Sequence, residues 1–217
     1  MRYDDTFIIA KDGMKCIAAA VAVMLFFMAI DAEFLTFLSV ILVLVTVWAY
    51  RNPERIIPHL EEDGIVSVAD GMITSIETLE DEEGNNSYKI VIKSGILDTP
   101  ILRVPFSCDV KEVEAISGAR LMLSMPLAQK LNEQSHIVFG KDDREVSVVH
   151  MLQLSSVGIK NRLAKESAVL QGMRYGLMVK GETTLVLPTH SRVAVKVGQR
   201  VRAGETLLGF FSTHETA

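Results

Sequence analysis

Histidine and cysteine are the residues of this chain best suited to bind metals or to act as nucleophiles and bases. The histidines are His59, His136, His150, His190 and His214, and their spacing matches no zinc-ligand pattern. The two cysteines, Cys16 and Cys108, form neither a disulfide framework nor a ligand pair, and they indicate a reducing compartment. We therefore predict no metal site and structural or exposed histidines, with His150, in an apolar run, the one that could approach a cleft.

Carboxylates gather in one acidic stretch, residues 80–86 (EDEEGNN). A calcium-binding loop needs a different ligand spacing, so this stretch is predicted to be the solvated tip of a β-hairpin. Asp70 stands in an Ala-Asp-Gly tripeptide, a common turn in which aspartate bonds nearby backbone. Taken by themselves, these acidic residues predict turns and not catalysis.

The elements that must position these residues are unevenly distributed along the 217-residue chain. Although 49% of the residues are hydrophobic, the only ionisable side chains between Cys16 and Tyr50 are Asp31, Glu33 and Tyr50 itself. Residues 51–217 resemble ordinary soluble sequence. The formal net charge of −5 argues against a nucleic-acid partner, because such partners are usually held by a basic surface.

Residues 14–50 predict a membrane helical hairpin. Its two apolar runs, residues 17–30 and 34–49, are separated by Asp31-Ala32-Glu33, whose carboxylates are costly inside hydrocarbon. Each run is shorter than the roughly 20 residues that cross a bilayer, so the hairpin is expected to span a thin bilayer or to insert from one side. A cleaved signal peptide and a buried pair of soluble helices are the alternatives.

The charges that flank the hairpin predict its orientation. Lys11 and Lys15 precede the first run, Arg51 and Arg55 follow the second, and the connection carries no lysine or arginine. Segment 1–13 and the domain after residue 51 are therefore expected on the cytoplasmic side of the cell (inner) membrane. Trp48 and Tyr50 stand where interfacial aromatic residues are expected, and Asn52-Pro53 ends the second helix.

Residues 51–217 predict a mainly β domain, a sandwich or a barrel, because short alternating runs recur about every ten residues. Residues 88–93 (YKIVIK) and 193–197 (VAVKV) alternate most regularly. Further predicted strands cover residues 65–68, 72–77, 101–104, 120–125, 134–139, 145–154, 177–180, 184–187 and 206–211. Near the end, Gly198 and Gly204 flank a short strand, as in biotinyl and lipoyl domains, but no attachment lysine motif accompanies them.

Three sequence motifs indicate a particular protein family. Residues 51–55 read RNPER, residues 66–71 read VSVADG, and residues 172–178 read GMRYGLM, followed by Gly181 and Leu187-Pro188. In order and spacing they resemble the short form of phosphatidylserine decarboxylase and its archaeal archaetidylserine counterpart, which are small pyruvoyl enzymes with an N-terminal membrane segment. The resemblance implies a mostly β domain with a barrel-like core that binds a phospholipid headgroup at the membrane surface.

The resemblance also implies what is missing. Family members make their electron sink, a pyruvoyl group, from the serine of a Gly-Ser dipeptide. Here residues 179–188 read VKGETTLVLP, so Glu182 follows Gly181 and the stretch is one residue shorter than in the family. A glutamate cannot undergo the elimination that yields a ketone. Thr183 has a hydroxyl that could give a 2-oxobutyryl analogue, but bulky Glu182 precedes it.

A second family residue is also replaced. The histidine of the family's Asp-Val-His element corresponds to Lys111, and a lysine is a poor base near neutral pH. The family-equivalent positions are thus Asp70, Lys111, Gly181, Glu182 and Thr183. We assign no catalytic residue among them and expect no pyruvoyl cofactor.

Three functions follow for a chain of this kind. The first is a catalytically degenerate, membrane-anchored relative of the decarboxylase, a pseudoenzyme that binds phospholipid headgroups or regulates. The second is an active phosphatidylserine or archaetidylserine decarboxylase of phospholipid biosynthesis with altered activation. The third is a membrane-tethered β-sandwich scaffold that recruits a protein partner. The expected partners are the phospholipid membrane and either a protein or a second copy of the chain.

Overall fold

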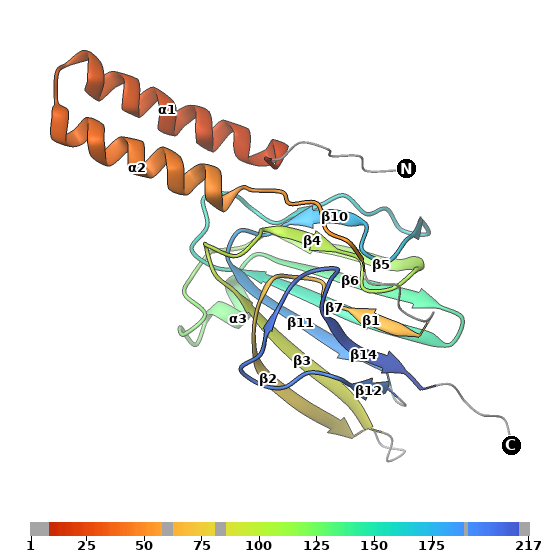
Figure 1. Cartoon of the computed structure of the whole chain (residues 1–217). Coiled ribbons are helices and arrows are strands. Elements are labelled where there is room, and N and C mark those ends of the chain that lie inside the picture. The colour runs from red at the N-terminus through yellow and green to blue at the C-terminus, as the bar shows by residue number, and fades with distance from the viewer. Residues whose placement is uncertain (1–8, 58–62, 81–85, 189–190, 213–217) are drawn as a thin grey trace, which may run out of the picture. The chain divides into compact units, whose positions relative to one another are not determined.

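A computed structural model describes residues 9–57, 63–80, 86–188 and 191–212 of the chain (Figure 1). The chain divides into two compact units, Met1–Glu54 and Arg55–Ala217. The first unit is helical and the second is built mainly from β-strands. The mainly β fold predicted for the larger part of the chain is therefore present.

Two apolar helices form the first unit, after a short 3-10 turn, η1 (Lys11–Gly13). Helix α1 (Met14–Ala29) and helix α2 (Glu33–Ala49) cover the two apolar runs. The connection is shorter than predicted, because Glu33 belongs to the first turn of α2, where the helix dipole favours an acid. Asp31 takes the remaining tight turn, with φ at 53°.

The helical unit contains one helical stretch that could cross a membrane by length and composition, Lys11–Ala29, and α2 is apolar but shorter. Few residues of Lys11–Ala29 are buried. Of the two aromatic residues predicted at the interface, Trp48 is exposed, with the Arg51 guanidinium over its ring. Tyr50 is buried against Gly13, where a side chain on residue 13 would collide with its ring.

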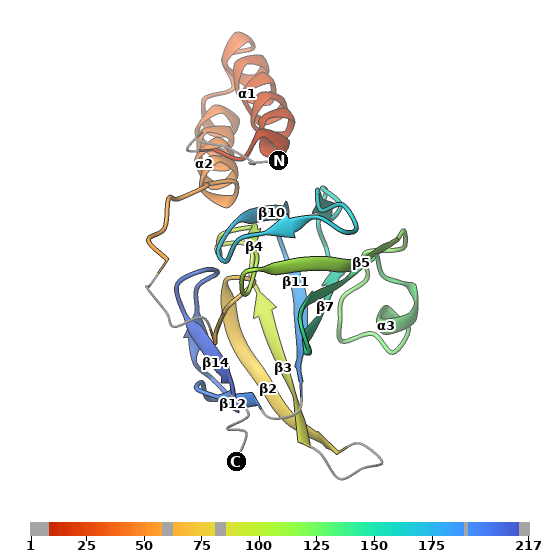
Figure 2. The same cartoon turned by 90° about the vertical axis from the view of Figure 1, so that its right-hand side faces the viewer.

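The β unit contains fourteen strands and one short helix among its described residues (Figures 1 and 2). The strands are β1 (Gly64–Val66), β2 (Gly71–Glu80), β3 (Asn86–Ser94), β4 (Ile101–Arg103), β5 (Cys108–Ile116), β6 (Gln134–Lys141), β7 (Arg144–Leu152), β8 (Lys160–Asn161), β9 (Ala168–Val169), β10 (Arg174–Leu177), β11 (Gly181–Leu187), β12 (Ser191–Val193), β13 (Arg200–Val201) and β14 (Leu207–Phe211). The helix is α3 (Ala128–Leu131).

These strands form three antiparallel sheets. The largest has the order β13-β2-β3-β11-β7-β6-β5-β9, and the two smaller sheets have the orders β1-β14-β12 and β4-β10-β8. Among the described strands, no pairing joins β13 to β9, so the largest sheet is open and a closed barrel is not confirmed. Residues 81–85, most of the predicted acidic hairpin tip, lie outside the described residues, between the paired strands β2 and β3.

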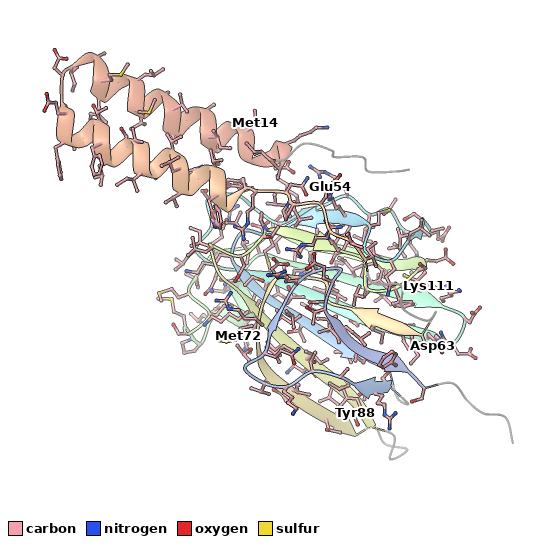
Figure 3. All side chains as sticks on the ribbon, in the orientation of Figure 1. Met14, Glu54, Asp63, Met72, Tyr88 and Lys111 are labelled. Atoms are coloured by element: carbon pink, nitrogen blue, oxygen red, sulfur yellow. The ribbon has the colours of Figure 1, made fainter. Side chains whose placement is uncertain are left out.

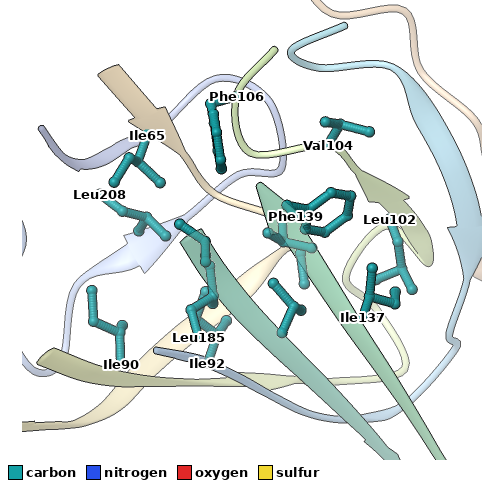
Figure 4. Packing of buried hydrophobic residues seen from close by; sticks show 14 of the residues in the cluster. Ile65, Ile90, Ile92, Leu102, Val104, Phe106, Ile137, Phe139, Leu185 and Leu208 are labelled. Atoms are coloured by element: carbon teal, nitrogen blue, oxygen red, sulfur yellow. The ribbon is translucent and has the colours of Figure 1, made fainter. Parts of the chain in front are cut away.

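One apolar core joins the three sheets (Figure 4). Ile92 and Leu185 come from the largest sheet, Leu208 from the β1-β14-β12 sheet and Leu102 from the β4-β10-β8 sheet. All four side chains are almost completely buried. Because burial of apolar surface is the main favourable term in folding, this shared core fixes the sheets against one another and positions the polar groups described below.

Several predicted strands need correction. Residues 120–125 form turns, because the amide and carbonyl of Leu121 bond to the Asn132 side chain instead of to a neighbouring strand. Strand β5 was not predicted, because most residues after Val110 are exposed and the apolar alternation is lost. A strand was predicted at residues 177–180, but β10 ends at Leu177. Another was predicted at residues 193–197, but β12 ends at Val193.

Candidate functional site

The segment that the resemblance matches to the family's self-cleavage site begins strand β11. Gly181 is the first residue of the strand, and a side chain there would lie 2.3 Å from the carbonyl oxygen of Met151 on β7. A glycine is therefore required because the two backbones approach closely. The register continues regularly, with Glu182 opposite Lys93 of β3 and Met151 of β7. The Gly181–Glu182 peptide thus belongs to a strand that is paired on both sides.

Thr183 belongs to a buried polar chain. Its Oγ1 lies 2.8 Å from Nδ1 of His150, and the other imidazole nitrogen lies 2.6 Å from the hydroxyl of Tyr175. Thr183 and His150 are direct partners across β11 and β7. All three side chains are almost completely inaccessible to solvent. This Thr183–His150–Tyr175 chain has the order of a nucleophile, a base and a group that orients the base, but it has no access to solvent.

Burial controls the ionisation of this chain. It lowers the pKa of His150 to about 3, and it raises the pKa of Tyr175 well above its ordinary value. His150 is therefore neutral at physiological pH. A neutral imidazole has one N–H, so it donates one of its two hydrogen bonds and accepts the other.

Asp70 lies at the centre of a second polar cluster. Its two carboxylate oxygens accept hydrogen bonds from the two terminal nitrogens of Arg55, at 2.5 and 2.6 Å, and one of them also accepts the amide of Ala203 at 2.8 Å. Arg55 in turn donates to the Ala203 carbonyl. This two-point ion pair joins two of the family-like motifs, RNPER and VSVADG, to the turn before β14.

Opposing influences determine the pKa of Asp70. Burial is the largest and raises the pKa, but the Arg55 hydrogen bonds and charge, together with the Ala203 amide, outweigh it and leave the pKa below its ordinary 3.8. Asp70 is therefore a carboxylate at neutral pH. Its anionic form is already engaged by Arg55, which makes it a poor proton acceptor in this state.

A short link connects Asp70 with the start of β11. The hydroxyl of Ser94 donates to the backbone carbonyl of Asp70 at 2.6 Å, and Ser94 is the register partner of Gly181. The following residue, Gly71, passes so close to β3 that a side chain there would lie 2.3 Å from the Lys93 carbonyl oxygen. The structure therefore brings the backbone of Asp70 close to Gly181 through Ser94.

Two further arginines lie beside this cluster. Arg103 of β4 and Arg174 of β10 are direct partners across the two strands. Arg103 is buried, donates to the Gly172 carbonyl and has its Cδ close to Gly204, the residue after Ala203. Burial, followed by the charges of Arg174 and Arg55, lowers the pKa of Arg103 to about 10. We call Arg55, Arg103 and Arg174, with Asp70 and Glu205, the arginine cluster.

Lys111 does not join these residues. It lies in a β-bulge of β5, between Val110 and Glu112, and its aliphatic chain covers Gly140 of β6. Strands β6 and β7 separate β5 from β11. Met72 and Glu182 both pair with Lys93, so Met72 marks the position of Glu182 along the sheet. In Figure 3, Lys111 and Met72 lie on opposite sides of the domain. Lys111 therefore has no geometry for proton transfer at Gly181 or Glu182.

The other candidate residues add no chemistry among the described parts of the chain. His136 is partly buried and bonds Gln134, whereas His59, His190 and His214 lie outside the described residues. Within residues 9–57, 63–80, 86–188 and 191–212, no group of three potential metal ligands converges. Cys108 is buried, and burial raises the pKa of its thiol to about 12, so it is not an activated nucleophile.

Sequence reasoning missed the partners that define both clusters. The sequence singles out His150 as the histidine that could approach a cleft, but it predicts neither its partners Thr183 and Tyr175 nor the Arg55–Asp70 ion pair. Residues 146–151 alternate buried and partly buried positions, so the inward position of His150 could have been found from β periodicity. The pairing of His150 with Thr183, 33 residues away, has no comparable local signal.

Together, the sheets and the two clusters define a class of protein. It is a mainly β domain after an apolar helical hairpin, in which a glycine-led central strand begins near the backbone of a buried aspartate. The sequence model of the phosphatidylserine decarboxylase family matches residues 42–209, more than half of the chain. The chain belongs to the phosphatidylserine decarboxylase family.

Individual relatives support the same assignment along nearly the whole chain. Each of the following is named a phosphatidylserine decarboxylase proenzyme. The protein from Geobacter metallireducens is 32% identical over 209 residues, covering 93% of this chain and 95% of its own. The Syntrophus aciditrophicus protein is 29% identical, covering 97% and 100%. The Desulfotalea psychrophila protein is 28% identical, covering 93% and 95%.

Proposed function

We propose that this chain is a membrane-anchored member of the family that does not form a pyruvoyl group and that binds phospholipid headgroups, in a regulatory or assembly role. The observation that carries the proposal is the start of β11. By the sequence resemblance, Glu182 stands where the family has its serine. The next hydroxyl, on Thr183, is completely buried within a strand paired on both sides. The residues at this site therefore do not fit the family's prosthetic group.

The arginine cluster supports a headgroup-binding role. A phosphoserine headgroup carries a phosphate, a carboxylate and an ammonium group, and guanidinium groups bind the first two by paired hydrogen bonds. Arg103 and Arg174 lie opposite each other beside the Arg55–Asp70 pair, so three cations and two carboxylates meet in one region. That arrangement suits a ligand with charges of both signs.

The hairpin supports the membrane anchor. Its apolar residues are largely exposed on both helices, as lipid-facing side chains would be. The flanking lysines and arginines favour a cytoplasmic location for both ends of the hairpin and for the β domain.

Headgroup binding is tested with the full chain in phosphatidylcholine nanodiscs titrated with a short-chain phosphatidylserine. We expect saturable binding that Arg103→Gln weakens about tenfold, because a charged hydrogen bond contributes about 1.5 kcal/mol or more. The matched control is Arg200→Gln, since Arg200 is exposed and pairs with Asp98. An equal loss of affinity in both variants, or no saturable binding by the wild-type chain, would contradict headgroup binding. The membrane-tethered scaffold would then be the favoured function.

One contact favours a second candidate function, an active decarboxylase with altered activation. The imidazole of His150 is within hydrogen-bonding distance of the Thr183 hydroxyl, as a base that starts an acyl shift would be. Cleavage would then fall between Glu182 and Thr183. The buried, fully paired strand opposes this reaction, and mass spectrometry of the intact chain separates the two functions.

A further inference from the structure

A group of large apolar side chains lies exposed beside α3. It consists of Met122, Met125, Leu127, Leu131 and Leu154, which are 48, 47, 58, 49 and 52% exposed. Leu154 adjoins the others because its amide bonds to the Arg120 carbonyl. In Figures 1 and 2 the segment around α3 stands out from the side of the largest sheet. We call these five residues the α3 patch.

The backbone that carries the α3 patch is held firmly. The Asn132 side chain is buried, accepts the Leu121 amide and donates to the carbonyls of Leu121 and Leu152, each at 2.9 Å. The buried Gln153 side chain accepts the amide of Leu123 at 3.2 Å. Two buried amide side chains thus fix the loop, while its apolar side chains point outward. Their exposure is a property of the folded loop and not of a frayed segment.

The charges near the α3 patch suit a lipid surface. Residues 115–132 contain no aspartate or glutamate, although the whole chain carries a net charge of −5. The cations of this segment are Arg120, which pairs with Glu133, and Lys130, which is exposed. The charge of Arg120 is balanced by Glu133, so the exposed Lys130 is the cation that this segment offers to lipid. Apolar side chains beside an exposed cation are typical of segments that insert into the interface of an anionic bilayer.

We propose that the α3 patch is a second membrane contact, which inserts into the lipid interface while the hairpin anchors the chain. The proposal builds on the membrane anchoring given under the proposed function. Once the hairpin is inserted, the β domain stays close to the lipid surface, so even a small apolar patch can remain in contact with it. The contact would hold the β domain in a fixed orientation on the bilayer.

Tryptophan fluorescence in the full chain provides the test. Trp48, in the hairpin, is the only tryptophan, so Trp48→Phe gives a background without one. Into this background we would introduce Leu127→Trp or Met125→Trp in the patch, and Leu97→Trp as the matched control. Leu97 is an equally exposed leucine, at 60%, and lies outside the patch. The proteins are reconstituted into vesicles of phosphatidylcholine with a minor share of phosphatidylglycerol.

Brominated phosphatidylcholine, which quenches only tryptophan in contact with lipid, is the readout. We expect roughly twofold quenching and a blue-shifted emission at positions 127 and 125, and neither at 97, because only the patch enters the interface. Absence of quenching at both patch positions, or equal quenching at 97, would overturn the proposal. A blue shift without quenching would indicate a protein contact, such as a second copy, and would overturn it as well.

The same measurement separates this proposal from the anchor on which it builds. In the wild-type chain the signal comes from Trp48 alone and reports the hairpin. Quenching of Trp48 without quenching at 127 and 125 would reject the α3 patch and leave the hairpin anchor intact. If Trp48 were not quenched either, the anchor itself would fail.

Discussion

Oγ1 of Thr183 lies 2.8 Å from Nδ1 of His150, directly opposite it across strands β11 and β7. The pair shows that the hydroxyl nearest to the family's cleavage position already has a fixed, buried partner. Tyr175 closes the chain on the other imidazole nitrogen. The contact stabilises the sheet without exposing a nucleophile.

The purified chain is expected to remain uncleaved at 24.0 kDa. Glu182 has no hydroxyl to start the acyl shift, and Thr183 is buried in a strand paired on both sides. Intact-mass spectrometry and a denaturing gel check this result. Two fragments that merge into one band on Thr183→Ala would show that the threonine route operates.

Glu182→Ser alone is expected to give little or no self-cleavage over hours. The new hydroxyl would lie in a regular strand and would lack a base, and a misplacement of about 1 Å can reduce a rate about a hundredfold. Adding Lys111→His should not help, because Lys111 lies on β5, which β6 and β7 separate from β11. Mass spectrometry over time measures the cleavage. Rapid, complete cleavage of the Glu182→Ser variant would contradict this prediction.

Acid should destabilise the β domain through His150. Its pKa is about 3 when folded and about 6.5 when unfolded, so below pH 6.5 the unfolded chain binds a proton that the folded chain does not. The free energy of unfolding therefore keeps its full value above pH 6.5. Below pH 6.5 it decreases by about 1.4 kcal/mol for each pH unit, so that about 2 kcal/mol is lost at pH 5. Denaturant unfolding of the chain in detergent at several pH values measures it.

The His150→Gln variant should lose most of this pH dependence, although it is less stable at neutral pH. His136→Gln is the matched control, because His136 is only partly buried and bonds Gln134. If the two variants kept the same slope as the wild type, the acid sensitivity would have another origin.

Asp70→Asn is expected to destabilise the chain by about 3 kcal/mol, because the buried guanidinium of Arg55 loses its nearest counter-charge and keeps only the longer contact with Glu205. Glu77→Gln, which breaks the exposed pair with Lys89, should have little effect and serves as the comparison. Thermal and denaturant unfolding measure the stability of both variants and of the wild type. Similar stabilities for Asp70→Asn and the wild type would mean that the ion pair is not structural.

The sequence by itself determined the features that depend on local patterns. Two uninterrupted apolar runs predict α1 and α2, and the alternation of residues 88–93 predicts β3, because helical and strand periodicities are visible within one element. The motifs around Asp70 and Gly181 indicated the family. That Glu182, and not a serine, follows Gly181 was also visible in the sequence alone.

Only the tertiary structure decided which side chains meet. His150 and Thr183 are 33 residues apart, so their contact depends on the pairing and register of β7 and β11, which no local pattern encodes. Arg55 and Asp70 are 15 residues apart in segments outside the strands, and only the folded chain brings them together. The same holds for Lys111: the sequence aligned it with a histidine, but the bulge in β5 and the strand order keep it away from Gly181. Strand order sets distances between side chains, because each intervening strand adds about 4.8 Å.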